Sequence, residues 1–192
     1  MKKSILTLVL GLLITTLSFG QEAKSLFNKE IPDMTVKLLN GMNKNLKEFA
    51  ENGKITVFTF WATWCVPCKK ELDNMVELYE GWQEDYNVEI VAVSTDDARS
   101  LAKVKATVNT NDWPYEILLD PNNDLKRVFN FNAVPHTIVL NEEGQVGYVH
   151  SGYVEGDEYV LEDEFIKMTS PNGVPVKEKK KKKTGAEIDG EQ

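Results

Sequence analysis

Residues 55–71 read ITVFTFWATWCVPCKKE and hold both cysteines of the chain, Cys65 and Cys68, two residues apart. A nearly continuous run of β-branched and aromatic residues precedes the pair, which predicts a strand buried on both faces. Apolar residues at helical spacing follow it, and predict a one-faced helix: Leu72, Met75, Val76 and Tyr79. Pro67 suits the first turn of this helix and Gly81 suits its end. The cysteines therefore lie where a central strand gives way to a helix.

This junction favours thiol chemistry. A helix N-terminus offers unpaired N–H groups and a partial positive charge, and both stabilise a thiolate. The thiolate is the nucleophilic form of cysteine. Cys65 lies at the start of the helix and is expected to be the more exposed sulfur, so it should attack a substrate. Cys68 lies one turn inside and should resolve the mixed disulfide.

Other interpretations of the pair remain open at this point. A zinc site needs four ligands, and the chain offers no further cysteine and only His136 and His150. A passive structural disulfide would close a very short loop, which constrains the unfolded chain little. A peroxidase of the peroxiredoxin kind would need a threonine three residues before its cysteine and a proline further back, where this chain has Ala62 and Phe58.

The segment WATWCVPCKKE resembles the active site of the thioredoxin fold, and its ending KKE resembles the TlpA/ResA-type branch of exported thiol–disulfide reductases. The resemblance covers residues 27–169 and implies one α/β domain with a mixed central sheet flanked by helices. It also implies an N-terminal hairpin around residues 34–41 and an inserted strand–helix segment, to which the strand at 88–93 and its following helix are assigned. Residues 94–96, which end in Asp96, are expected to cap that helix.

The resemblance also implies a wall facing the cysteines. Pro135 holds the place of the cis-proline of the thioredoxin fold, and a cis bond there would leave the backbone of Val134 free to pair with an extended substrate; a trans loop proline is the alternative. Trp64 is expected to shape the substrate surface. His136 follows Pro135 and either tunes the thiolate, since its charge changes near neutral pH, or is a bystander.

Glu71 is the predicted acid of the site. In ResA-like proteins a glutamate at this position acts in the redox site; the alternative is a partly exposed helix glutamate at the margin between core and solvent. Thr59 stands where thioredoxin carries a buried aspartate, so Glu71 is the best remaining acid. Trp61, Trp64 and Pro67 are expected to shape the site, and core packing is the alternative for both tryptophans.

Charge is unevenly distributed along the 192 residues, whose formal net charge is −8. Residues 1–20 and 171–192 each carry +2, so the body between them carries −12, which argues against nucleic acid as a ligand.

Residues 1–20 have a lysine start, an apolar stretch and small residues before Gln21, which predicts a signal peptide; an uncleaved anchor is the alternative. Residues 171–192 are rich in lysine, glycine and proline and are predicted to be a disordered tail, with weak docking on anionic lipid as the alternative.

These observations predict an exported, periplasmic thiol–disulfide oxidoreductase that reduces protein disulfides through Cys65 and Cys68, without a cofactor or metal. The resemblance implies disulfide-containing exported proteins as substrates, with apocytochrome c as one candidate, and a membrane thiol protein as the electron donor. A disulfide oxidase or isomerase of the same fold is the alternative enzyme. A peptide-binding module without turnover is the alternative from another class.

Overall fold

The computed structural model describes residues 31–170, so the predicted signal peptide and the lysine-rich tail lie outside the described residues. The strands are β1 (Thr35–Leu38), β2 (Asn43–Asn45), β3 (Ile55–Trp61), β4 (Val88–Ser94), β5 (Glu116–Leu119), β6 (His136–Leu140) and β7 (Val146–Ser151). The helices are α3 (Lys47–Ala50), α4 (Val66–Tyr86), α5 (Leu101–Asn111), α6 (Asp124–Val128) and α7 (Asp157–Thr169), and a 3₁₀ turn, η1 (Ala98–Ser100), precedes α5.

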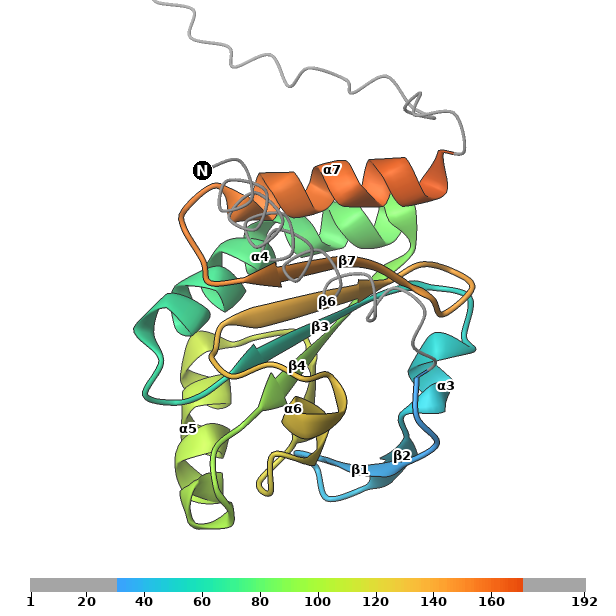
Figure 1. The fold of residues 1–192 in the computed structure, drawn as a ribbon. Coiled ribbons are helices and arrows are strands. Elements are labelled where there is room, and N and C mark those ends of the chain that lie inside the picture. The colour runs from blue at the N-terminus through green and yellow to red at the C-terminus, as the bar shows by residue number, and fades with distance from the viewer. Residues whose placement is uncertain (1–30, 171–192) are drawn as a thin grey trace, which may run out of the picture.

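The strands form one mixed sheet in the order β2-β1-β5-β4-β3-β6-β7 (Figure 1). β3 lies inside the sheet, parallel to β4 and antiparallel to β6, and all its residues are buried. A strand in this place needs side chains on both faces that are either apolar or hydrogen-bonded within the protein, which explains its near-continuous apolar sequence. The strand, its burial and the helix after it confirm the prediction from residues 55–71.

The central motif consists of β3, α4, β4, β6, β7 and α7, and it has the thioredoxin arrangement. β4 pairs with β3 along its full length, from Ile55 opposite Val88 to Trp61 opposite Ser94. The assignment of this strand to an inserted segment is therefore wrong. The crossover through α4 returns the chain directly beside β3 in a β-α-β unit. The additional strand is β5, which lies between β4 and the N-terminal hairpin β1–β2.

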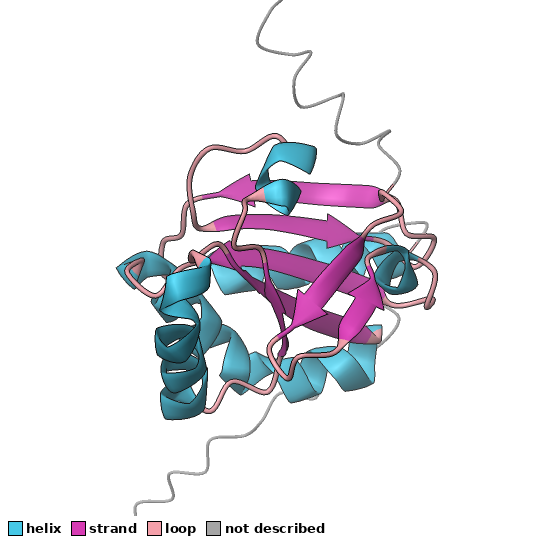
Figure 2. Ribbon diagram, turned by 90° about the horizontal axis from the view of Figure 1, so that it is seen from below, coloured by secondary structure: helices cyan, strands magenta, loops and turns pink. Residues whose placement is uncertain are grey.

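Helices cover both faces of the sheet (Figures 1 and 2). One core lies under α4, α5 and α7, where the buried residues include Leu72, Val104 and Phe165. The other lies under α3 and α6, and includes Phe49 and Leu125. The predicted hairpin is confirmed by the antiparallel pairing of β1 with β2.

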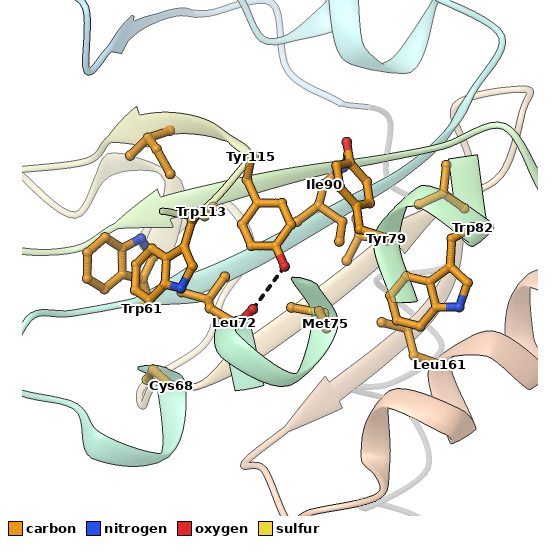
Figure 3. Close-up of a cluster of buried hydrophobic side chains, with 14 of the residues drawn as sticks. Trp61, Cys68, Leu72, Met75, Tyr79, Trp82, Ile90, Trp113, Tyr115 and Leu161 are labelled. Atoms are coloured by element: carbon orange, nitrogen blue, oxygen red, sulfur yellow. Dashed lines mark hydrogen bonds between the residues drawn. The ribbon is translucent and has the colours of Figure 1, made fainter. Parts of the chain in front are cut away.

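The helix after the cysteines is longer than predicted. α4 continues through Gly81 to Tyr86 and ends at Asn87, which adopts a left-handed conformation. Trp82, directly after the glycine, is 2% exposed and packs against Phe165 at 5.2 Å between ring centroids. A glycine inside a helix costs about 1 kcal/mol, whereas burial of a large aromatic side chain stabilises by more. Figure 3 shows Trp82 in this core, near Leu161.

Candidate active site

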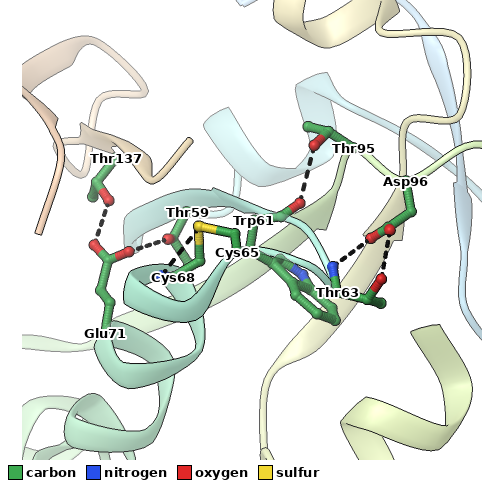
Figure 4. The surroundings of a disulfide bond; sticks show 9 residues. All are labelled: Thr59, Trp61, Thr63, Cys65, Cys68, Glu71, Thr95, Asp96 and Thr137. Atoms are coloured by element: carbon green, nitrogen blue, oxygen red, sulfur yellow. Dashed lines mark hydrogen bonds between the residues drawn. A yellow bond between two sulfur atoms is a disulfide. The ribbon is translucent and has the colours of Figure 1, made fainter. Parts of the chain in front are cut away.

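Cys65 and Cys68 form a disulfide at the N-terminus of α4 (Figure 4). Cys65 is the N-cap residue, and its Sγ accepts a hydrogen bond from the backbone N–H of Cys68 at 3.3 Å. Cys65 is 4% exposed and Cys68 is 0% exposed, so the order of exposure predicted for the two sulfurs is confirmed. The hydrogen bond and the free N–H groups of the first turn would stabilise a thiolate on Cys65.

The side chains beside Cys65 face solvent. Trp64 is 68% exposed and Val66 is 70% exposed, and Pro67 is exposed as well. Trp61, by contrast, is fully buried and packs edge-on against Trp113 at 4.9 Å between centroids. The two tryptophans of the motif thus differ: Trp64 lies on the surface that a partner would meet, and Trp61 supports the core beneath it.

Asp96 fixes the loop that carries the cysteines, and the sequence interpretation missed this. Its carboxylate is buried and accepts hydrogen bonds from the Thr63 backbone N–H at 2.8 Å and the Thr63 hydroxyl at 2.7 Å. The prediction that Asp96 caps the next helix is wrong, since Asp97 caps η1. The carboxyl ends of parallel strands meet at one edge of a sheet. A polar residue directly after β4 could therefore have been predicted to lie near the loop that follows β3.

Pro135 is cis, as expected. It immediately precedes β6, whose first residue, His136, pairs with Phe60 near the carboxyl end of β3. This register brings Pro135 to the edge of the sheet from which the cysteine loop leaves. Val134 is partly buried, and the Pro135 carbonyl accepts from Gly152 N–H at 2.9 Å.

His136 points away from the cysteine side of the sheet. Its imidazole stacks on Phe131 at 4.3 Å between centroids, and its Nδ1 lies 2.8 Å from Ser151 Oγ. It shares this face with Phe60, whereas the cysteines belong to the core under α4. Burial lowers the His136 pKa to about 4, which keeps the ring neutral at physiological pH. The placement favours the bystander alternative over a tuning role.

Glu71 is buried and does not lie at the margin between core and solvent. It is 5% exposed, although glutamate is almost never fully buried unless it is paired. Its Oε1 accepts from the Thr137 hydroxyl at 2.8 Å and its Oε2 from the Thr59 hydroxyl at 3.2 Å (Figure 4). The two threonines stand opposite each other on β6 and β3. The helix therefore supplies the buried acid, and Thr59 contributes a donor to it.

Burial raises the pKa of Glu71 from 4.5 to about 7. The hydrogen bonds from Thr137 and Thr59 act in the opposite direction, because they stabilise the carboxylate, and the nearby charges of Asp157 and Glu158 add to the rise. Glu71 lies one helical turn from Cys68, so the site holds a carboxyl group that exchanges its proton near neutral pH beside the sulfur that would resolve a mixed disulfide. This arrangement suits general acid–base chemistry.

A small pocket lies behind Glu71, lined by Thr137, Tyr148, His150, Tyr153 and Glu158 among others. The Tyr153 hydroxyl donates to Glu158 at 2.8 Å and accepts from Asn74 on α4 at 2.6 Å. These bonds tie the segment before α7 to the helix of the cysteines. Across residues 31–170, no group of three or more His, Cys, Asp or Glu side chains is arranged to hold a metal ion.

Comparison with known proteins agrees with this site. Residues 27–149 match the AhpC/TSA family. The thiol–disulfide oxidoreductase ResA of Bacillus cereus is 32% identical over 128 residues, which cover 67% of this chain and 71% of the relative. The chain is a ResA-type member of the AhpC/TSA family.

Solved structures show the same fold around this ResA-type site. A thioredoxin-like protein from Porphyromonas gingivalis superposes with a TM-score of 0.64 at 34% identity, covering 73% of this chain and 94% of that one. A protein from Chlorobium tepidum described as a thiol:disulfide interchange protein DsbE gives a TM-score of 0.64 at 20% identity, covering 74% of this chain and 96% of its own. Both confirm the thioredoxin-like fold. None of the helices within residues 31–170 has the length and apolar character that crossing a membrane requires.

Proposed function

We propose that this chain is an exported thiol–disulfide oxidoreductase that reduces disulfides in other proteins. The observation that carries the proposal is the Cys65–Cys68 pair at the start of α4, flanked by exposed Trp64 and Val66. The name of the Bacillus cereus relative supports the reaction class.

The reaction transfers two electrons from the dithiol to the substrate. The Cys65 thiolate attacks one sulfur of a substrate disulfide, forms a mixed disulfide and releases the other substrate sulfur as a thiolate. Cys68 then attacks Cys65 Sγ, and this second attack releases the remaining substrate thiolate and leaves the Cys65–Cys68 disulfide. The geometry suits this order, since Cys65 is the more exposed sulfur and the Cys68 N–H already contacts Cys65 Sγ. A membrane thiol protein would restore the dithiol.

The reducing direction is supported by the two residues between the cysteines. Val66 and Pro67 bring no charge that would stabilise a thiolate, unlike the surroundings of strongly acidic cysteines in oxidising proteins. We therefore expect a reduction potential of about −200 to −280 mV. Equilibration of the protein with glutathione mixtures measures this potential. A value near −120 mV, the range of a strong oxidant, would favour the oxidase alternative.

Val134 and Pro135 are proposed to bind the substrate backbone beside the cysteines. Pro135→Ala restores an N–H and favours a trans bond, so the wall next to Cys65 should change shape. We expect the rate of protein disulfide reduction to fall by about 10-fold or more, since small displacements of positioning groups have effects of this size. The midpoint of thermal unfolding is the control for folding. Reduction at the wild-type rate by a well-folded variant would contradict the proposed role.

The proposal of export and of partners is supported by the sequence and by its resemblance to exported reductases. The lysine start and apolar stretch of residues 1–20 support export, and the acidic body argues against nucleic acid. Oxidised exported proteins are the proposed substrates, and apocytochrome c is one candidate among them. Residues 171–192 are proposed to take no part in the redox reaction, because their composition does not build a core.

A further inference from the structure

We propose that the groove between the first turns of α4 and the exposed face of α5 binds an acidic, extended segment of the substrate protein. The inference rests on the proposed disulfide exchange at Cys65 and adds the kind of sequence that the exchange selects.

The groove begins next to the attacking sulfur. Val66, which directly follows Cys65, forms part of its lining, together with Lys69, Lys70 and Asp73 on α4. Lys103 and Thr107 line it from α5. Figure 1 shows α5 beside the start of α4, on the β4 side of β3. Pro135 lies on the opposite, β6 side, so the groove and the proline wall flank the cysteines from two directions.

Its charge differs from that of the protein around it. Three lysines line the groove against one carboxylate, Asp73, which accepts a hydrogen bond from Trp113 Nε1 at 2.7 Å. Lys70 pairs with Glu155 at 2.6 Å. Among the described residues, no ion pair occupies Lys69 or Lys103. A cationic groove thus opens beside the nucleophile of a chain whose residues 21–170 carry −12.

Because of this contrast, the groove should favour substrates by the charge of the segment next to their disulfide and not by their net charge. The acidic body repels anions at a distance, but salt at 0.1 M largely screens that repulsion beyond about 10 Å. An Asp or Glu side chain that enters the groove meets Lys69 and Lys103 at short range, while the hydroxyl group of Thr107 can bind the backbone of the segment. Val66, which is 70% exposed, offers an apolar contact at the rim nearest the cysteines.

The test uses peptides with one cysteine in a mixed disulfide with mercaptoethanol, flanked by acidic, neutral or basic residues. The pre-reduced protein supplies the two electrons of a single turnover, and we expect its second-order rate constant with the acidic peptide to exceed that with the neutral one by about 3- to 10-fold at low salt, as one or two partly exposed ion pairs would give. The preference should largely disappear at high salt. Hydroxyethyl disulfide, which has no charge and no flanking residues, reports the exchange reaction alone.

Lys103→Glu and Lys105→Glu form a matched pair of variants. Both residues are exposed on α5 and change the net charge equally, but Lys105 lines a different hollow, with Leu38 and Tyr115. The quantity compared is the rate constant for the acidic peptide divided by that for the neutral peptide. We expect Lys103→Glu to reduce this ratio at least 3-fold and Lys105→Glu to retain most of the wild-type ratio. No acidic preference in the wild type, or equal effects of the two variants, would overturn the groove proposal. Failure of the wild type to reduce hydroxyethyl disulfide would instead contradict the proposed function.

Discussion

Cys68→Ser should stop the reaction at the mixed disulfide. Reduced variant, mixed with a disulfide-containing protein in the absence of small thiols, should accumulate a covalent complex through Cys65, because a serine hydroxyl does not displace a sulfur. We expect turnover to fall at least about 1,000-fold, as for the loss of a reacting group in other covalent mechanisms. Non-reducing electrophoresis and mass spectrometry measure the complex, and its partner proteins from the exported fraction would identify physiological substrates.

Cys65→Ser is the matched control for this trap. It leaves Cys68, which is 0% exposed and lies inside the first turn of α4. A buried thiol is a poor nucleophile toward a protein disulfide, so this variant should form little or no complex. The reduced wild type sets the reference for stability, since neither variant has the Cys65–Cys68 bond. Equal trapping by the two variants would contradict the assigned roles of the sulfurs.

The sequence predicted the parts of the site that depend on neighbours along the chain. The strand, the cysteine pair and the start of α4 are continuous, so the apolar run and the helical spacing within residues 55–79 were enough. The cis bond at Pro135 came from the resemblance, and the structure has it. His136 shows how a local rule adds to the structure: side chains alternate along a strand, so once Thr137 is placed against Glu71, His136 lies on the opposite face, where it stacks on Phe131.

The other parts depend on pairing between distant segments. Glu71 could be placed beside the apolar stripe of α4, but its burial follows from Thr59 and Thr137, which the register of β3 and β6 brings together. The role of Asp96 likewise follows from the parallel pairing of β3 with β4. Gly81 was a local stop signal that the tertiary contacts of Trp82 outweigh. Helical spacing and propensity contain none of these cross-strand contacts.

Glu71→Gln should change the pH dependence of stability in the oxidised protein. The Glu71 pKa is about 7 in the fold, against an ordinary value of 4.5. Below pH 4.5 the carboxyl group is neutral in both states, so the folded protein suffers no penalty. Between pH 4.5 and 7 the unfolded chain ionises first, and the folded state loses up to about 3 kcal/mol of stability.

A glutamine does not ionise, so the variant should escape this loss. The difference in unfolding free energy between Glu71→Gln and wild type should therefore move in favour of the variant by up to about 3 kcal/mol from pH 4 to pH 8. Denaturant unfolding at a series of pH values measures it. Glu77→Gln, an exposed position on the same helix, removes the same charge and should show no such change.

The same variant tests whether Glu71 acts in the resolving step. The carboxylate, one turn from Cys68, is proposed to take the Cys68 proton when that sulfur attacks, and its negative charge raises the thiol pKa in return. Glu71→Gln should thus lower the apparent thiol pKa, yet slow release of substrate from a preformed mixed disulfide by about 100-fold, because the base is lost. Alkylation rate against pH gives the first quantity and single-turnover release the second. The contrary outcome is that the thiol pKa and the release rate of Glu71→Gln equal those of Glu77→Gln, although its pH-dependent gain in unfolding free energy is observed. Glu71 is then a buried structural acid, and the proton of Cys68 leaves by another route.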